Sequence, residues 1–161
     1  MDKIKETSLC YIEDNNRYLM LHRVKKINDM NHDKWLGVGG KLEEGEGPEE
    51  CMLREVYEET GLRLSSWRYR GIIFFNNDIY ESEIMHLFTA DSYTGEISDC
   101  DEGVLEWVGK EQVTSLPIWE GDKLFFRLLN SSEPFFRLEL NYSGEILMSA
   151  FLNGEEIDTA S

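Results

Sequence analysis

Residues 40–62 place glycine, glutamate and arginine at fixed spacings, and this pattern constrains the fold more than any other feature of the chain. The segment has the form Gly-x5-Glu-x7-Arg-Glu-aliphatic-x-Glu-Glu-x-Gly-aliphatic. Pro48, directly after Gly47, indicates a helix start because proline is tolerated in a first helical turn. Gly61 indicates the helix end because glycine readily adopts the left-handed conformation found there. The pattern predicts a helix over residues 48–60.

This predicted helix has an apolar arc and an acidic arc. A period of about 3.6 residues places five residues on one arc that is expected to face the core; they are Met52, Leu53, Val56, Tyr57 and Thr60. Glu55, Glu58 and Glu59 stand at positions i, i+3 and i+4, so they cluster on the neighbouring arc. Arg54 is spaced to pair with both Glu50 and Glu58.

The clustered carboxylates repel one another, and one arginine does not neutralise them all. A hard divalent cation prefers oxygen ligands of this kind, and magnesium commonly binds through a few carboxylates together with substrate phosphates. Such a site suits hydrolysis of a phosphoanhydride, because the metal neutralises developing charge and positions the attacking water. A solvated acidic helix face is the alternative for an acidic helix taken alone, and the complete spaced pattern favours the metal site.

Alternating apolar residues and turn signals predict a set of strands around this helix. The predicted strands cover residues 7–12, 18–22, 35–38, 63–75, 83–90 and 104–108, and a closing hairpin covers 135–141 and 145–151. Residues 93–103 are predicted as an acidic loop, 110–116 as a short helix or turn, 121–129 as a second helix and 154–161 as a frayed end. These elements predict an α/β fold in which a mixed β-sheet lies between helices, an α/β/α sandwich.

The spaced pattern resembles the signature of the Nudix hydrolases, which cleave a nucleoside diphosphate linked to another group. The resemblance implies one Nudix domain over residues 1–161, the α/β/α sandwich and Mg²⁺, with Mn²⁺ as a substitute. It implies that Glu55, Glu58 and Glu59 are metal ligands together with the Gly39 carbonyl. Arg54 is then expected to orient the glutamates, and Glu46 to brace the turn between loop and helix.

Three further segments resemble the MutT-type, 8-oxo-dGTP-hydrolysing branch of this family and its eukaryotic oxidised-purine triphosphatases. These segments are residues 34–41, 101–108 and 117–122. Glu102 matches an acid that approaches the metal from a facing loop. Three other acids compete for this role, namely Asp99, Asp101 and Glu106.

Two residues of the third segment match base-binding positions. Trp119 matches an aromatic residue that stacks on the nucleobase, and a core or surface tryptophan is the alternative. Asp122 matches an acid that reads the purine edge, and an N-cap of the following helix is the alternative. The eukaryotic enzyme has asparagine in place of Leu36 and a second aspartate in place of Gly121, so base recognition is expected to differ in detail.

The net charge of −16 disfavours binding to nucleic acid polymers and to anionic membranes, which call for basic patches. Lys26 and Lys41, close to the spaced pattern, are candidate phosphate contacts, with ordinary surface charge as the alternative. No apolar run reaches the roughly 18 residues of a transmembrane helix, and the first residues are polar. Three widely spaced cysteines favour a reducing compartment, so we expect a cytoplasmic protein. Its expected partner is a small-molecule nucleotide, and it is expected to be a monomer or homodimer.

Together these features predict a magnesium-dependent pyrophosphohydrolase. It is expected to convert a purine nucleoside triphosphate, above all 8-oxo-dGTP, to the monophosphate and pyrophosphate, and so to sanitise the nucleotide pool. The catalytic residues are expected to be Arg54, Glu55, Glu58, Glu59 and Glu102, with the general base left open among Glu55, Glu58 and Glu102. The alternatives are another nucleoside-diphosphate substrate (ADP-ribose, a sugar nucleotide or a capped RNA end), a non-catalytic nucleotide sensor, and an acidic interaction module.

Overall fold

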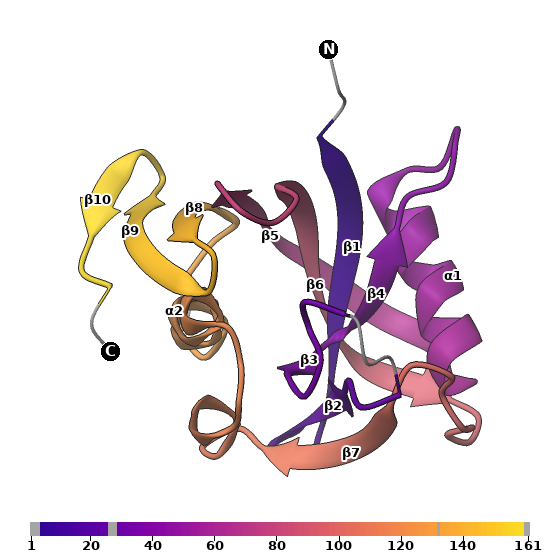
Figure 1. Ribbon diagram of the computed structural model, residues 1–161. Helices are drawn as coiled ribbons and strands as arrows, with labels where there is room; N and C mark the ends of the chain where they lie inside the picture. The colour runs from indigo at the N-terminus through magenta and orange to yellow at the C-terminus, as the bar shows by residue number, and fades with distance from the viewer. Residues whose placement is uncertain (1–3, 26–28, 132, 160–161) are drawn as a thin grey trace.

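The computed structural model describes residues 4–25, 29–131 and 133–159, and Figure 1 shows the arrangement of its elements. In chain order these are β1 (Lys5–Asp14), β2 (Arg17–His22), β3 (Trp35–Leu36), β4 (Val38–Lys41), α1 (Pro48–Thr60), β5 (Arg63–Asn77), β6 (Glu83–Thr94), β7 (Val104–Gly109), the 3-10 helix η1 (Val113–Ser115), α2 (Glu120–Leu129), β8 (Phe136–Ser143), β9 (Ile146–Leu152) and β10 (Glu155–Ile157).

The strands form one mixed sheet in the order β10-β9-β8-β5-β6-β1-β2-β3, with β4 added on β1 and β7 on β2. The pairs β1–β6 and β5–β8 are parallel, whereas β5–β6 and β8–β9 are antiparallel. Parallel and antiparallel pairs in one sheet confirm the predicted mixed topology. Residues Lys5 to Ile12 run alongside Glu83 to Ala90, which brings the start of the chain to the middle of the sheet.

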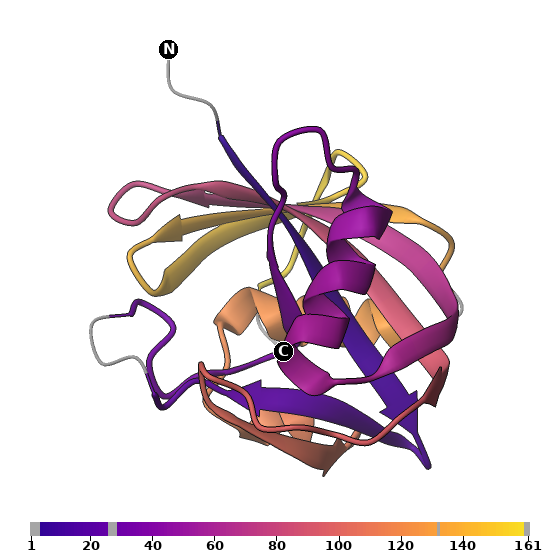
Figure 2. The same cartoon turned by 90° about the vertical axis from the view of Figure 1, so that its right-hand side faces the viewer.

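The two helices cover opposite faces of the sheet, as the two views in Figures 1 and 2 show. On the α1 side, Met52 and Val56 pack with Phe88 in one apolar cluster. On the α2 side, a larger and aromatic cluster includes Phe125 and Phe126. Burial of these two cores removes apolar surface from water and so stabilises the three layers. The predicted α/β/α sandwich is confirmed.

Helix α1 has the predicted bounds, and Gly61 ends it with a positive φ of 80°. One predicted pairing is wrong: Glu50 does not contact Arg54 but accepts a 3.2 Å hydrogen bond from the Gly47 backbone N–H, and so caps the helix start. The expected apolar arc is also wrong at Tyr57, which is 47% exposed. Cys51 is buried instead, because α1 packs against β4 and the Cys51 thiol lies 3.4 Å from the Gly40 carbonyl oxygen.

Several other boundaries differ from the sequence-based expectations. Strand β6 continues to Thr94, so the predicted loop 93–103 is shorter than expected. Strand β10, which pairs with β9, falls in the segment expected to fray, and that expectation is wrong for Glu155–Ile157. Helix α2 begins at Glu120 with Trp119 as its N-cap, so the alternative role of Asp122 as an N-cap is wrong.

Within the described part of the chain, no helix has both the length and the apolar character that crossing a bilayer would require. The three cysteines, Cys10, Cys51 and Cys100, are all buried free thiols. Burial raises the pKa of each thiol above its ordinary value. These thiols therefore act as small apolar groups of the core.

Candidate active site

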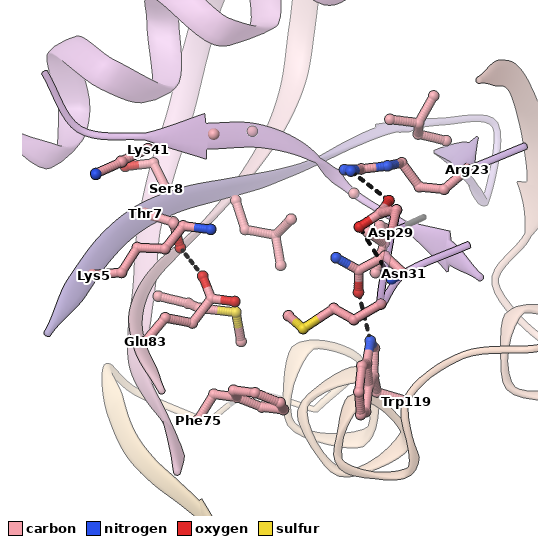
Figure 3. Close-up of a pocket in the computed structure, with 18 of the residues that line it drawn as sticks. Lys5, Thr7, Ser8, Arg23, Asp29, Asn31, Lys41, Phe75, Glu83 and Trp119 are labelled. Atoms are coloured by element: carbon pink, nitrogen blue, oxygen red, sulfur yellow. Dashed lines mark hydrogen bonds and ion pairs between the residues drawn. The ribbon is translucent and has the colours of Figure 1, made fainter. Parts of the chain in front are cut away.

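A cavity of about 470 Å³ opens between the sheet, the segment 29–31 and the start of α2. Figure 3 shows it with Lys41 and Ser8 at one side and with Phe75 and Trp119 at another. Gly39, Gly40 and Glu102 also line the cavity. The loop of the spaced pattern and the proposed base-binding residues thus face one common space.

Arg54 is the centre of the charged network on α1. Its guanidinium donates two hydrogen bonds to Glu46, at 2.8 and 2.9 Å. Its Nη1 atom also donates to Glu55 at 2.8 Å and to Glu58 at 3.2 Å. The Arg54 hydrogen bonds lower the pKa of Glu46 to about 2. The Glu46 carboxylate also accepts a bond from the Glu43 backbone N–H, so it joins the loop before α1 to the helix.

Two glycines of β4 permit close approaches, Gly40 to the helix α1 and Gly39 to the neighbouring strand β1. A Cβ atom on Gly40 would lie 2.5 Å from Glu55 Cδ, and one on Gly39 would lie 1.9 Å from the Ser8 carbonyl oxygen. The Gly39 backbone N–H donates a 3.0 Å hydrogen bond to Glu59 Oε2. The carboxylates of Glu55 and Glu59 therefore lie directly against the glycine strand β4.

These carboxylates are poorly solvated. Burial raises the pKa of Glu55, and the charges of Glu58 and Glu102 raise it further. Burial and the neighbouring Glu102 carboxyl raise the pKa of Glu59 to about 9. Crowded carboxylates with raised pKa values bind a proton or a cation in order to relieve their mutual repulsion.

The oxygen-only donor set fits a hard divalent cation such as Mg²⁺. Glu55, Glu58, Glu59 and Glu102 are the side chains that would hold it: the charges of Glu58 and Glu102 raise the pKa of Glu55, and those of Glu102 and Glu55 raise the pKa of Glu59. Among the described residues, however, no three acidic, histidine or cysteine side chains already converge as a coordination shell. Arg54 donates hydrogen bonds to Glu55 and Glu58, so both carboxylates are held in position beside the glycine strand.

Glu102 is the acid that the structure brings to the cavity from the loop before β7. It lines the cavity, and Arg23 Nη1 lies 3.3 Å from its carboxylate. The competing acids Asp99, Asp101 and Glu106 are all exposed and do not line this cavity. Of the four candidates, Glu102 alone is therefore placed beside the α1 glutamates.

Trp119 and Asp122 both line the cavity. The Trp119 ring is only 6% exposed and meets the rings of Phe75 and Tyr142 edge to face, each with centroids 5.3 Å apart. Asp122 is 5% exposed. Burial raises the pKa of its carboxyl well above the ordinary range, against the opposing influence of Lys34. Asp122 thus holds a proton more tightly than an ordinary aspartate does.

Of the two predicted phosphate contacts, only Lys41 belongs to the described part of the chain. Lys41 lines the cavity, whereas Lys26 lies outside the described residues. Sequence reasoning missed several polar side chains that also line the cavity, among them the four residues Lys5, Arg23, Asn31 and Glu83. None of the four belongs to a local motif, and only the pairing of distant segments brings them together.

A family model described as the NUDIX domain matches residues 4–129. The chain therefore belongs to the Nudix family. Its fold and its glutamate-rich helix are those of a hydrolase that acts on nucleotide-like substrates, and such hydrolases generally use divalent metal ions such as Mg²⁺.

Individual relatives extend this likeness over most of the chain. An uncharacterised Nudix hydrolase of Bacillus subtilis is 26% identical, and the match covers 98% of this chain and 99% of that protein. The oxidised purine nucleoside triphosphate hydrolase of Danio rerio is 36% identical over 63% of this chain and 66% of that protein. The crystal structure of a MutT protein from Bacillus halodurans is 27% identical and covers 94% of this chain and 99% of its own, with a TM-score of 0.80.

Proposed function

We propose that this protein hydrolyses purine nucleoside triphosphates to the monophosphate and pyrophosphate with a divalent cation, and that 8-oxo-dGTP is its preferred substrate. The observation that carries this proposal is the single cavity that joins Glu102 and the glycine strand to Trp119 and Asp122. A nucleotide has its phosphates at one end and its base at the other. This cavity likewise has charged residues at one side and aromatic residues at another. Removal of oxidised nucleotides from the pool is the corresponding cellular role.

The charged end suits attack on a phosphoanhydride. A cation held by Glu55, Glu58, Glu59 and Glu102 would neutralise negative charge on the phosphates and orient them. Arg54 keeps the carboxylates of Glu55 and Glu58 in place through its hydrogen bonds, and a glutamate of this cluster accepts the proton from the attacking water. Lys41 at the cavity rim offers a positive charge to the phosphates.

The aromatic end suits a purine. Stacking of a base on an aromatic ring contributes about 1–3 kcal/mol, with little choice among bases, so Trp119 supplies affinity. Asp122 supplies choice, because a protonated carboxyl both donates and accepts hydrogen bonds. The likeness to the Danio rerio oxidised purine nucleoside triphosphate hydrolase supports this assignment.

A second candidate is hydrolysis of a dinucleotide-like substrate. An NAD-capped RNA hydrolase of Vibrio parahaemolyticus is 32% identical over 54% of this chain, but the match covers only 31% of that protein. The net charge of −16 opposes binding to an RNA chain. ADP-ribose, which has the same kind of diphosphate linkage but no RNA chain, is therefore the substrate used to test this second candidate.

The test is kcat/KM with Mg²⁺ for 8-oxo-dGTP, dGTP, dATP and ADP-ribose, with pyrophosphate and monophosphate followed separately. A preference for 8-oxo-dGTP of more than tenfold, about 1.4 kcal/mol, supports the proposal. Turnover of ADP-ribose alone contradicts it and favours the second candidate. Glu58→Gln is expected to abolish turnover, and Glu49→Gln, a matched change at an exposed position of the same helix, is expected to leave it unchanged.

A further inference from the structure

Glu83, the first residue of β6, projects into the cavity across from Trp119 (Figure 3). Its Oε2 atom accepts a 2.9 Å hydrogen bond from the Thr7 hydroxyl, because the parallel pairing of β1 and β6 sets these strands side by side. Within the described residues, no hydrogen bond to the other oxygen, Oε1, is formed. One carboxylate oxygen is thus anchored and the other is available to a ligand.

Asp122 faces the same cavity from the start of α2. Its side chain is 95% buried, since only 5% of the residue is exposed. No other described residue forms a hydrogen bond with the Asp122 carboxyl. Because Asp122 lines the cavity, its carboxyl is open to a polar ligand bound there.

The two carboxyls differ in their surroundings. Burial raises the pKa of both. The nearby Lys5 charge and the Thr7 hydroxyl favour the ionised form of Glu83, whereas the Glu83 charge adds to the effect of burial on Asp122. Glu83 is therefore the acceptor of the pair, and Asp122 is the group that retains a proton.

We propose that Glu83 is a specificity-determining residue that accepts hydrogen bonds from the N1–H and 2-amino groups of a guanine-type base while Asp122 donates to the same base. This inference rests on the proposed function, because it requires that a nucleobase occupies the cavity. Guanine carries acceptors at O6 and N7 and a donor at its 2-amino group. The acceptors match Asp122 as a donor, and the 2-amino group matches Glu83 as an acceptor.

Adenine is a poor match for the same pair. Its N1 atom is an acceptor where guanine has a donor, so it would place a lone pair against the Glu83 carboxylate. A site built to hydrogen-bond a substrate group discriminates strongly against an analogue that lacks it, because the polar groups of the site are then left unpaired. The pair thus favours guanine, with or without oxidation at C8, over adenine.

The test compares wild type, Glu83→Gln and Glu96→Gln, a matched change at an exposed position after β6. In each protein kcat/KM is measured for dGTP, dITP (which lacks the 2-amino group) and dATP. Glutamine keeps an acceptor for Thr7 but adds a donor toward the base. Glu83→Gln is expected to lower kcat/KM for dGTP at least tenfold, mainly through KM, to reduce the preference for dGTP over dITP, and to leave dATP unchanged or improved.

An equal loss of kcat/KM for dGTP and dATP in Glu83→Gln would overturn the proposal, because it would reveal a purely structural role. An unchanged preference for dGTP over dITP would overturn it as well. Binding of GMP and AMP to the same three proteins, measured by calorimetry, needs no turnover. If wild type hydrolyses none of the triphosphates, the proposed function fails, and a GMP preference that Glu83→Gln abolishes still supports Glu83. If neither GMP nor AMP binds wild type, the role of Glu83 is refuted as well.

Discussion

The indole nitrogen of Trp119 donates a 2.7 Å hydrogen bond to the side-chain oxygen of Asn31. The Lys34 ammonium lies 4.9 Å from the centroid of the same ring and pairs with Glu145 in the turn between β8 and β9. The segment 31–34, whose Lys34 is itself held by Glu145, thereby fixes the orientation of an aromatic ring that is distant in sequence. The stacking surface of the cavity is set before any ligand binds.

Loss of the Asn31 contact is expected to weaken binding rather than the chemical step. A hydrogen bond of this kind contributes about 1 kcal/mol, so Asn31→Ala is expected to raise KM for the triphosphate about fivefold with little change in kcat. Asn31→Asp keeps the acceptor and is the control for the missing hydrogen bond. Steady-state kinetics separate the two constants, and an unchanged KM in Asn31→Ala would contradict the assigned role.

The two glycines of β4 are expected to respond differently to the same substitution. An added methyl group on Gly40 meets the Glu55 carboxyl, whereas one on Gly39 meets the backbone of Ser8. A side chain is able to move aside and a strand backbone is not. Gly40→Ala is therefore expected to fold but to lose activity, and Gly39→Ala to lower the free energy of unfolding, with urea denaturation and kcat as the readouts. The reverse pattern would contradict this reading.

Arg54→Lys is expected to reduce kcat about 100-fold, the scale of loss caused by a misplaced catalytic group. Lysine keeps the positive charge but lacks the planar fork that contacts Glu46, Glu55 and Glu58 at once. Arg68→Lys, at an exposed position of β5, is the matched control. Near wild-type kcat in Arg54→Lys would show that charge alone is sufficient there.

Asp122 is expected to make stability depend on pH. Its folded-state pKa is raised well above the ordinary 3.8, so the folded chain keeps a proton that the unfolded chain releases. The resulting stabilisation is fully present below about pH 4 and is lost as pH rises toward the folded pKa. Asp122→Asn lacks this dependence. The free energy of unfolding of Asp122→Asn minus that of wild type is therefore expected to be larger at pH 8.5 than at pH 5. A difference that does not change with pH would refute the raised pKa of Asp122.

Added Mg²⁺ is expected to stabilise the fold through Glu59 and its neighbours. A cation at 100 times its dissociation constant adds about 2.7 kcal/mol to the free energy of unfolding. Urea denaturation in MgCl₂ and in EDTA measures this gain. Glu59→Gln is expected to reduce it and Glu49→Gln to preserve it. An equal gain in Glu59→Gln would place the cation elsewhere.

Local signals were sufficient to predict α1 and its carboxylates. Gly47 and Pro48 mark the start of the helix and Gly61 marks its end, and α1 begins and ends at these positions in the structure. The direction in which α1 faces the sheet was harder to predict, because burial of Cys51 rather than Tyr57 depends on contact with β4. Periodicity alone does not report which strand a helix will meet.

The walls of the cavity were predicted only where a local motif included them. Trp119 and Asp122 belong to such a motif, whereas Asn31 and Glu83 do not. Asn31 contacts a residue 88 positions away, and Glu83 contacts Thr7 across 76 positions. Their positions follow from the pairing of β1 with β6 and from the packing of the segment 29–31 on α2. No short sequence pattern encodes either relationship.

The charged and aromatic ends of the cavity come from different parts of the chain. The α1 glutamates lie against the glycine strand β4, which lines one end of the cavity. Phe75, Glu83 and Asp122, which also line the cavity, are carried by β5, β6 and α2. Substitutions in the aromatic end are therefore expected to leave the position of the α1 glutamates unaltered. Such a scaffold lets substrate choice diverge among descendants of one ancestral enzyme while the hydrolytic step is retained, and it gives an engineer the same freedom.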